Sequence, residues 1–204
     1  MGGPVNKSAA RPKPISGLHD VELAQLSMAG DRAAFGELAR RHGSAVRALL
    51  RRMGADPALA DDLAQDAFLA AFQAIADFRG EGAFAGWVKR IAARLYIKRW
   101  RKRAELDPVE DGPEQADPAG DDRLADARLD LDDALKTLNA AERLCVTLCY
   151  GAGLSHSEAA EAINAPIGTV KSHVKRGLDK LRRRLGVPMA AEPDSEGTGV
   201  RSNG

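Results

Sequence analysis

The chain has 204 residues, a formal net charge of +1 and 44% hydrophobic residues, so one or two small domains are expected. Two cysteines and four scattered histidines support neither a disulfide framework nor a metal site, and we expect no cofactor. No apolar run reaches the roughly 20 residues of a membrane helix, and the N-terminus lacks a signal-peptide core, so we expect a cytoplasmic protein without membrane insertion.

Helices are predicted almost throughout, because Ala, Leu, Arg and Asp dominate while β-branched and aromatic residues are few. The tails, residues 1–17 and 187–204, are rich in Gly, Pro, Ser and charge and are predicted to be disordered. Between 18 and 103 we predict a first domain of four helices, over about 20–29, 31–53, 57–78 and 84–103. Asp31 and Asp56 suit N-caps, Pro57 suits the first helical position, and Gly54 ends the second helix.

The third predicted helix is acidic in its first half and carries Leu63, Phe68 and Leu69 beside the acids. Acids near a helix start interact favourably with the helix dipole, which would make them structural. An acidic helix with Leu, Phe and Gln also suits a helix-on-helix protein interface. The residues alone leave these two interpretations even.

The fourth predicted helix interleaves aromatic and basic side chains. Residues 87–103 hold eight basic residues and no acidic ones, together with Tyr96 and Trp100. Bases stack on aromatic faces while cations hold the phosphate backbone, so this pattern favours nucleic-acid binding. The alternative is that Tyr96 and Trp100 pack on a neighbouring helix.

An acidic stretch follows. Residues 104–120 contain three prolines and predict a flexible acidic linker, and residues 105–133 hold twelve acidic residues against two arginines. Residues 171–184 are basic again, with seven cations against Asp179. Two basic blocks separated by an acidic one predict two polyanion-binding surfaces. Ordinary charged helix faces would explain any one block, but explain all three in this order less well.

A second domain is predicted over 121–186, with helices over about 124–138, 141–150, 155–163 and 168–185. Ser155 and Glu158 form a capping box, and Asn164, Pro166 and Gly168 supply a turn and a fresh helix start. Two helices joined in this way, with the second rich in Lys and Arg, predict a helix-turn-helix that enters the DNA major groove.

The last predicted helix is amphipathic. Its buried arc holds Val170, Val174, Leu178, Leu181 and Leu185. On the opposite arc Arg176 could pair with a guanine edge, whereas Lys175 suits phosphates; Lys180 is also predicted to contact phosphate. A basic amphipathic helix with a solvated face is the alternative.

Two motif blocks carry a resemblance to a known family. The first is DRAAFGELARRHGSAVRALLRRM with ADDLAQDAFLAAFQAIADFRG and FAGWVKRIA; the second is LKTLNAAERLCVTLCYGAGLSHSEAAEAINAPIGTVKSHVKRGLDKLRRRL. In this order they resemble regions 2 and 4 of extracytoplasmic function (ECF) sigma factors of the sigma-70 family. The resemblance implies an all-α fold of two small helical domains and a subunit of RNA polymerase without catalytic residues of its own.

The resemblance also implies residue roles and partners. A polymerase-binding face on the β′ clamp would consist of Asp62, Leu63, Gln65, Asp66, Phe68 and Leu69. The −10 promoter element would be opened by the loop 78–84 and the fourth helix, with contacts from Arg79, Lys89, Arg90, Arg94, Tyr96, Lys98 and Trp100. The −35 element would be read by Thr169, Lys171, Ser172, His173, Lys175 and Arg176. Region 4 would also touch the β flap, the acidic linker would thread the polymerase channel, and an anti-sigma factor would be a further partner.

The chain departs from the family pattern at a few positions. Arg94 and Lys98 stand where the family usually has Asn and Asp, Asn139 replaces the usual Pro, and His173 replaces a common Arg. Two rival functions remain: a stand-alone helix-turn-helix regulator, and a nucleic-acid-modifying enzyme with a helix-turn-helix appendage. The stand-alone regulator would need a dimer interface, and it would give residues 18–103 no function.

Overall fold

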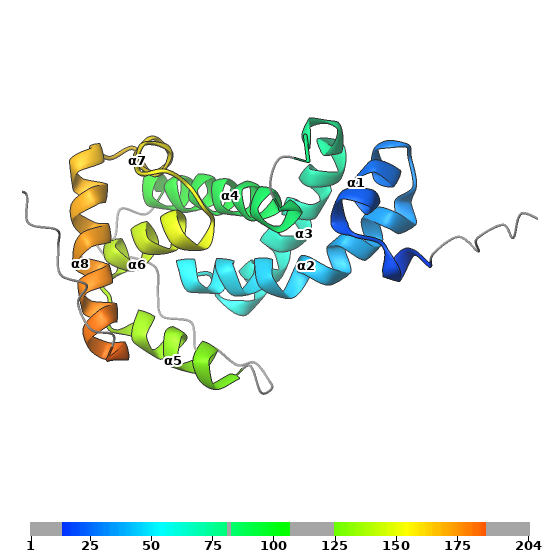
Figure 1. Ribbon diagram of the computed structural model, residues 1–204. Coiled ribbons are helices and arrows are strands. Elements are labelled where there is room, and N and C mark those ends of the chain that lie inside the picture. Colours follow the sequence, from blue (N-terminus) through cyan, green and yellow to red (C-terminus); the bar gives the residue numbers. More distant parts are fainter. Residues whose placement is uncertain (1–13, 81–82, 107–124, 187–204) are drawn as a thin grey trace, which may run out of the picture.

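The computed structural model describes residues 14–80, 83–106 and 125–186, and every regular element within these ranges is helical (Figure 1). A 3₁₀ turn, η1 (Ile15–Gly17), precedes four helices in the first half of the chain: α1 (Asp20–Met28), α2 (Arg32–Met53), α3 (Pro57–Gln73) and α4 (Phe84–Leu106). The second half contains α5 (Ala125–Lys136), α6 (Ala140–Val146), α7 (His156–Ile163) and α8 (Ile167–Leu185).

In the first half, α2 packs against α1, α3 and α4. Its ends are set by local chemistry, since the Asp31 side chain accepts hydrogen bonds from two backbone N–H groups and Gly54 caps the C-terminus with φ of 108°. Asp56 caps α3 in the same way, with Pro57 at the first helical position. These predicted helix starts and stops are confirmed.

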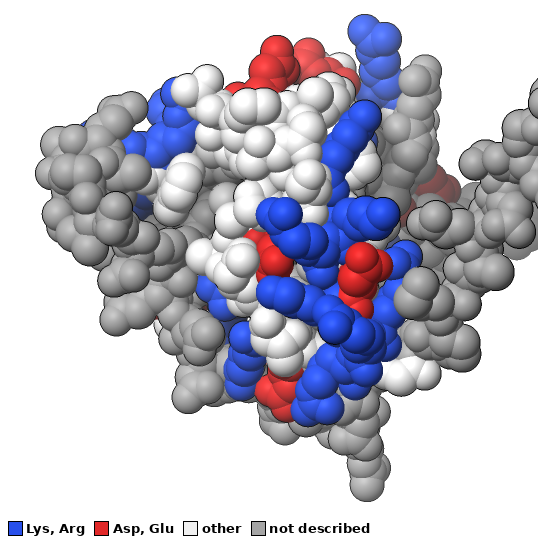
Figure 2. Space-filling model, turned by 90° about the vertical axis from the view of Figure 1, so that its left-hand side faces the viewer, with Lys and Arg blue, Asp and Glu red and all other residues white. Residues whose placement is uncertain are grey.

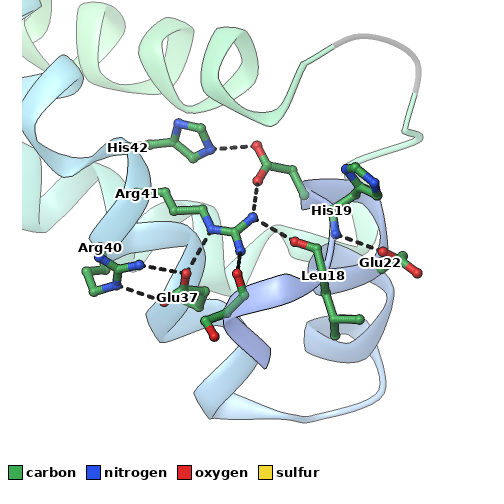
Figure 3. A network of polar contacts seen from close by, with 9 residues as sticks. Leu18, His19, Glu22, Glu37, Arg40, Arg41 and His42 are labelled. Carbon is green, nitrogen blue, oxygen red and sulfur yellow. Dashed lines mark hydrogen bonds and ion pairs between the residues drawn. The ribbon is translucent and has the colours of Figure 1, made fainter. Parts of the chain in front are cut away.

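A polar network holds α1 to α2 (Figure 3). Arg41 donates to the carbonyl oxygen of Leu18 at 2.8 Å and to the Asp20 carboxylate at 3.1 Å, while its Nε bonds Glu37 at 2.8 Å. The second Asp20 oxygen lies 2.6 Å from Nε2 of His42. One guanidinium therefore orders the chain entering α1, because it satisfies a backbone carbonyl and two carboxylates together.

In the second half, α8 packs on α5, α6 and α7. The crossing with α6 is close at Gly177, where an added Cβ would lie 2.7 Å from Val146 Cγ2. Between α6 and α7 the chain makes a π-helical turn, η3 (Thr147–Gly151). Only a residue without a side chain fits at this crossing, so Gly177 sets how near α8 approaches α6.

One hydrophobic cluster extends across both halves, and a second, smaller cluster lies within the second half between α5, α6 and α8. Buried residues of α2 and α4, such as Leu49 and Val88, belong to the same cluster as Leu144 and Leu148 of the second half. At Gly151 of η3 an added Cβ would lie 2.7 Å from Leu49 Cδ1, so the backbone of one half touches the other. The sequence predicted two tethered domains; the structure packs them together. The predicted flexibility of the linker concerns residues that lie mostly outside the described ranges.

Several predicted boundaries differ from the structure. In the second half, the helix predicted over 141–150 is α6, which ends at Val146 and is followed by the π-helical turn η3, and the helix predicted over 124–138 is α5, which ends at Lys136. The third helix ends at Gln73 and gives way to a 3₁₀ turn, η2 (Ile75–Asp77), rather than continuing to residue 78. Phe78 is buried and packs edge-on to Phe84, with ring centroids 5.6 Å apart. The fourth helix runs to Leu106 rather than 103, and η1 lies within the predicted N-terminal tail, where Arg41 bonds the Ser16 carbonyl at 2.9 Å. The rest of the tails lies outside the described residues.

Candidate nucleic-acid interface

The cationic face of α8 is open to solvent. Figure 2 looks onto the side of the molecule where α8 lies, and Lys and Arg side chains gather there in a broad band with few acidic residues between them. Five of the six residues predicted to read DNA on this helix are exposed and His173 is half-buried; the exposed ones are Thr169, Lys171, Ser172, Lys175 and Arg176. The opposite arc is buried at Val170, Val174 and Leu181 and half-buried at Leu178, as predicted, but Leu185 at the end of the helix is 42% exposed, so the predicted burial is wrong there.

The turn that presents α8 is built by local chemistry. Ser155 and Glu158 form the predicted capping box, with the Ser155 N–H donating to Glu158 at 2.8 Å. Asn164 ends α7 in the left-handed region at φ 54°, and Pro166 then leads into α8. The two helices pack on each other. This arrangement is a helix-turn-helix whose second helix projects its polar face outward.

A buried carboxylate lies beneath α8. Glu142 of α6 is 2% exposed, and its carboxylate accepts a hydrogen bond from Lys180 Nζ at 2.7 Å. Its other oxygen lies 3.7 Å from Nε of Arg176. Burial would raise the pKa of Glu142, but hydrogen bonds from Lys180 and from the Asn139 backbone outweigh it and leave the pKa lowered. Glu142 is therefore an anion, and Lys180, which was predicted to contact phosphate, is ion-paired with it while its side chain remains 37% exposed.

The predicted −10 residues fall into three groups by exposure, and all of them except Arg79 lie on α4. Arg79, Arg90, Arg94 and Lys98 are exposed, while Lys89 and Trp100 are half-buried. Tyr96 is 3% exposed, and its hydroxyl donates a hydrogen bond to the Met53 carbonyl at 2.8 Å. Its ring therefore belongs to the core and is not available for the predicted contact with DNA. Of the loop 78–84, Phe78 and Phe84 are buried, and residues 81–82 lie outside the described ranges.

Two of the α4 cations contact the second half of the chain. Arg90 donates to the Gly153 carbonyl at 2.7 Å, and Arg94 lies 3.9 Å from Glu158 of α7. A shallow groove between α4 and α7 is lined by cations of α4 and carboxylates of α7, including Lys98 and Glu161. The cationic surface of α4 therefore faces α7, whereas the cationic surface of α8 faces solvent.

Four of the six predicted polymerase-binding residues lie on the exposed surface of α3, whereas Leu63 belongs to the core and Phe68 is half-buried. Asp62, Gln65 and Asp66 are exposed, and Leu69 is 58% exposed. Phe68 is half-buried and Leu63 is buried, where it supports the helix from the core side. The surface thus combines carboxylates with an exposed apolar side chain.

The described residues give no support to catalysis or metal binding at the cysteines. Burial raises the pKa of the Cys145 thiol to about 11, and it also raises that of Cys149. Both thiols are therefore protonated at neutral pH, and protonated thiols are poor nucleophiles and metal ligands. No cluster of three or more His, Cys, Asp or Glu residues suited to a metal ion occurs within the described ranges. A search of the described helices for a membrane-spanning segment finds none.

Fold and surface together define a helix-turn-helix protein of the class that reads double-stranded DNA. Residues 38–105 match the family model of Sigma-70 region 2, and residues 134–183 match that of Sigma-70, region 4. The RNA polymerase sigma factor NccH of Alcaligenes xylosoxydans is 34% identical over 175 residues, which cover 81% of this chain and 94% of NccH.

Two further relatives agree with this assignment. The ECF RNA polymerase sigma factor SigM of Mycobacterium tuberculosis is 34% identical over 169 residues, covering 82% of this chain and 85% of SigM. The sigma factor RpoE in complex with the anti-sigma factor NepR, from Bartonella quintana, is similar in structure, with a TM-score of 0.51 and 27% identity over 76% of this chain and 98% of RpoE.

The chain belongs to the ECF sigma factors of the sigma-70 family. It is an RNA polymerase sigma factor, a non-enzymatic subunit that directs transcription initiation. The predicted all-helical fold with a region 2 and a region 4 is confirmed.

Proposed function

We propose that this sigma factor is a dissociable, cytoplasmic subunit that reads the −35 promoter element with α8 and the −10 element with α4, while α3 docks on the β′ clamp of core polymerase. The observation that carries the proposal is the α8 surface. Hydroxyls, ammonium groups and the Arg176 guanidinium project to solvent from a helix whose other side is buried at Val170, Val174 and Leu181. Such a helix supplies both base-edge and phosphate contacts.

Docking on polymerase is assigned to the exposed surface of α3. Leu69 provides an apolar anchor, and Asp62, Gln65 and Asp66 surround it with acidic and amide groups. An exposed leucine within a charged rim suits a protein partner better than DNA, because phosphates repel carboxylates. Region 4 would in turn touch the β flap, as the family resemblance implies.

Reading both promoter elements requires the two halves to separate. The elements are about 25 base pairs apart, roughly 85 Å at about 3.4 Å per pair, whereas the halves are in direct contact here. Separation would also release Arg90 and Arg94 from Gly153 and Glu158. Core polymerase would hold the halves apart and make promoter binding effectively bivalent.

An anti-sigma factor is the proposed regulatory partner. The RpoE relative is solved in complex with its anti-sigma factor NepR, and another relative, CnrH, with the cytosolic domain of CnrY. A protein that binds this chain in its packed form would keep it from polymerase. The stand-alone regulator is the less favoured function, because it leaves the α3 surface without a partner.

The deciding experiment is in vitro transcription with core polymerase and full-length protein. We expect core enzyme to initiate at defined start sites only when the chain is added, and Leu69→Asp to abolish co-purification with core. Gln73→Asp, at an exposed position later on α3, is the matched control and should retain binding. Failure to direct any specific start, or equal binding of both variants to core, would contradict the proposal.

A further inference from the structure

Arg176 of α8 forms an ion pair with a residue of another helix, Glu142 of α6. Glu142 lies in the first turn of α6, where it completes the capping box with Asn139. Its backbone is fixed by that cap, since the Glu142 N–H donates to Asn139 Oδ1 at 2.8 Å. The carboxylate is nearly inaccessible to water at 2% exposure, yet it faces α8. A buried anion in this place needs partners, and α8 supplies them.

Lys180 and Arg176 contact different oxygens of the Glu142 carboxylate. Lys180 Nζ lies 2.7 Å from one oxygen, and Arg176 Nε lies 3.7 Å from the other. Arg176 also bonds Nδ1 of His173 at 3.0 Å through its Nη2. Arg176 and Lys180 are four residues apart, so they project from the same side of α8, with Gly177 between them at the crossing with α6.

We infer that Glu142 is a positioning residue for DNA reading: it orients the Arg176 guanidinium toward the base edges, and Lys180 serves as its counter-ion rather than as a phosphate contact. This inference rests on the proposed function of α8. Arg176 is 56% exposed at its side chain, with Nε facing the buried carboxylate and Nη2 bonded to His173, so much of the guanidinium still borders solvent. A planar guanidinium restrained in this way loses less conformational freedom when it meets a guanine edge.

Two lysines of α8 are expected to contribute differently to the salt dependence of DNA binding. Lys175 is exposed and has no ion pair among the described residues, whereas Lys180 is engaged with Glu142. A lysine that contacts phosphate contributes about 0.9 to the slope of log affinity against log salt. We therefore expect Lys175→Gln to lower this slope by about 0.9 in the holoenzyme–promoter complex. Lys180→Met should leave the slope unchanged.

The central test compares Glu142→Gln with Arg176→Ala in holoenzyme, on promoters carrying every single base change in the −35 element. Glutamine keeps the acceptor for the Asn139 cap and the side-chain volume, so the fold is retained; circular dichroism and thermal melting verify this. Arg176→Ala should lose discrimination at one base pair, and Glu142→Gln should reduce it at the same pair about tenfold. The double variant should match Arg176→Ala alone.

The outcomes distinguish the inference from the proposed function. If Arg176→Ala and Lys175→Gln both leave −35 selectivity and salt dependence untouched, α8 is not the reader and the proposed function fails. If Arg176→Ala loses discrimination but Glu142→Gln weakens all promoters equally, or adds to Arg176→Ala, Glu142 is merely structural and the inference is wrong. A salt slope lowered by Lys180→Met as much as by Lys175→Gln would overturn the counter-ion assignment. Should Glu142→Gln unfold, Lys180→Met still tests that assignment.

Discussion

The two cationic helices α4 and α8 look alike in sequence but differ in their surroundings. Residues 87–103 hold eight basic residues and residues 171–184 hold seven. On α8 these side chains border solvent (Figure 2), whereas on α4 Arg90 and Arg94 contact the second half of the chain and Tyr96 lies in the core. Charge density alone therefore does not tell which surface is ready to bind. If α8 and α4 read the −35 and −10 elements as proposed, the −35 surface is available in the packed form, and the −10 surface becomes fully available only when the halves separate.

The largest expected effect concerns charge removal on the two helices. Lys171→Gln with Lys175→Gln should lower the salt slope of −35 duplex binding by about 1.8 and weaken binding at least about tenfold, in free protein and holoenzyme alike. Lys98→Gln with Arg94→Gln should have a comparable effect on −10 binding in holoenzyme and almost none in free protein. Fluorescence anisotropy across a salt series measures both pairs. Equal losses for the two pairs in free protein would remove the distinction between the helices.

A second expectation is that a larger side chain at Gly151 weakens the contact between the two halves. A valine there would place a side chain against Leu49, whose Cδ1 lies 2.7 Å from the ideal Cβ position. Overpacking of this kind costs about 1–3 kcal/mol, so Gly151→Val should favour the separated form. Small-angle X-ray scattering should show a larger radius of gyration. Gly36→Ala, where an added Cβ meets nothing within 4 Å, is the control and should leave the radius unchanged.

Local signals predicted most of the helix boundaries. Asp31, Gly54 and Asp56 mark their helix ends through hydrogen bonds to neighbours in sequence, so a short window of sequence suffices. The polar face of α8 was predictable for the same reason, because helix periodicity is local.

What the sequence could not predict depends on residues far apart in the chain. Arg90 meets Gly153 across 63 positions, and Lys180 meets Glu142 across 38. Neither pairing leaves a periodic pattern. Lys180 was therefore predicted as a phosphate contact, although the charge that neutralises it comes from α6. The packing of the two halves was not predicted, because it depends on contacts between residues far apart in the chain, such as Gly151 and Leu49.

A third expectation concerns an ion pair that joins α2 to α5. Arg52 Nε lies 2.6 Å from Asp132, and both side chains are about one quarter exposed, at 28% and 24%. Because solvent screens a partly exposed ion pair, the contribution of this pair to stability is small. Arg52→Gln should therefore destabilise the packed form by about 1 kcal/mol. Thermal unfolding and scattering measure the change. Arg40→Gln removes a pair that lies within α2, to Glu37 at 2.8 Å, and should not alter the spacing of the halves.

The smallest expected effect is a pH-dependent loosening at α7. Hydrogen bonds from Ser155 lower the pKa of Glu158, and the nearby Arg90 and Arg94 lower it further. A carboxyl whose folded pKa lies below its ordinary value stabilises the fold fully above that ordinary value, and the contribution is lost as pH falls through the folded pKa. Acidification below about pH 4.5 should therefore release Arg94 and shift the molecule toward the separated form, by no more than about 0.5 kcal/mol because the pair is exposed.

Glu158→Gln isolates that contribution, because glutamine keeps the capping box with Ser155 but carries no charge. Its distance between halves, measured by energy transfer between dyes on α2 and α8, should match the wild type at acid pH and exceed it slightly at pH 7. Added salt should remove the difference at pH 7, since screening acts on an exposed pair. If wild type and variant respond identically to acid, Arg94 is not held by charge, and α4 owes its position in the packed form to the hydrophobic contacts alone.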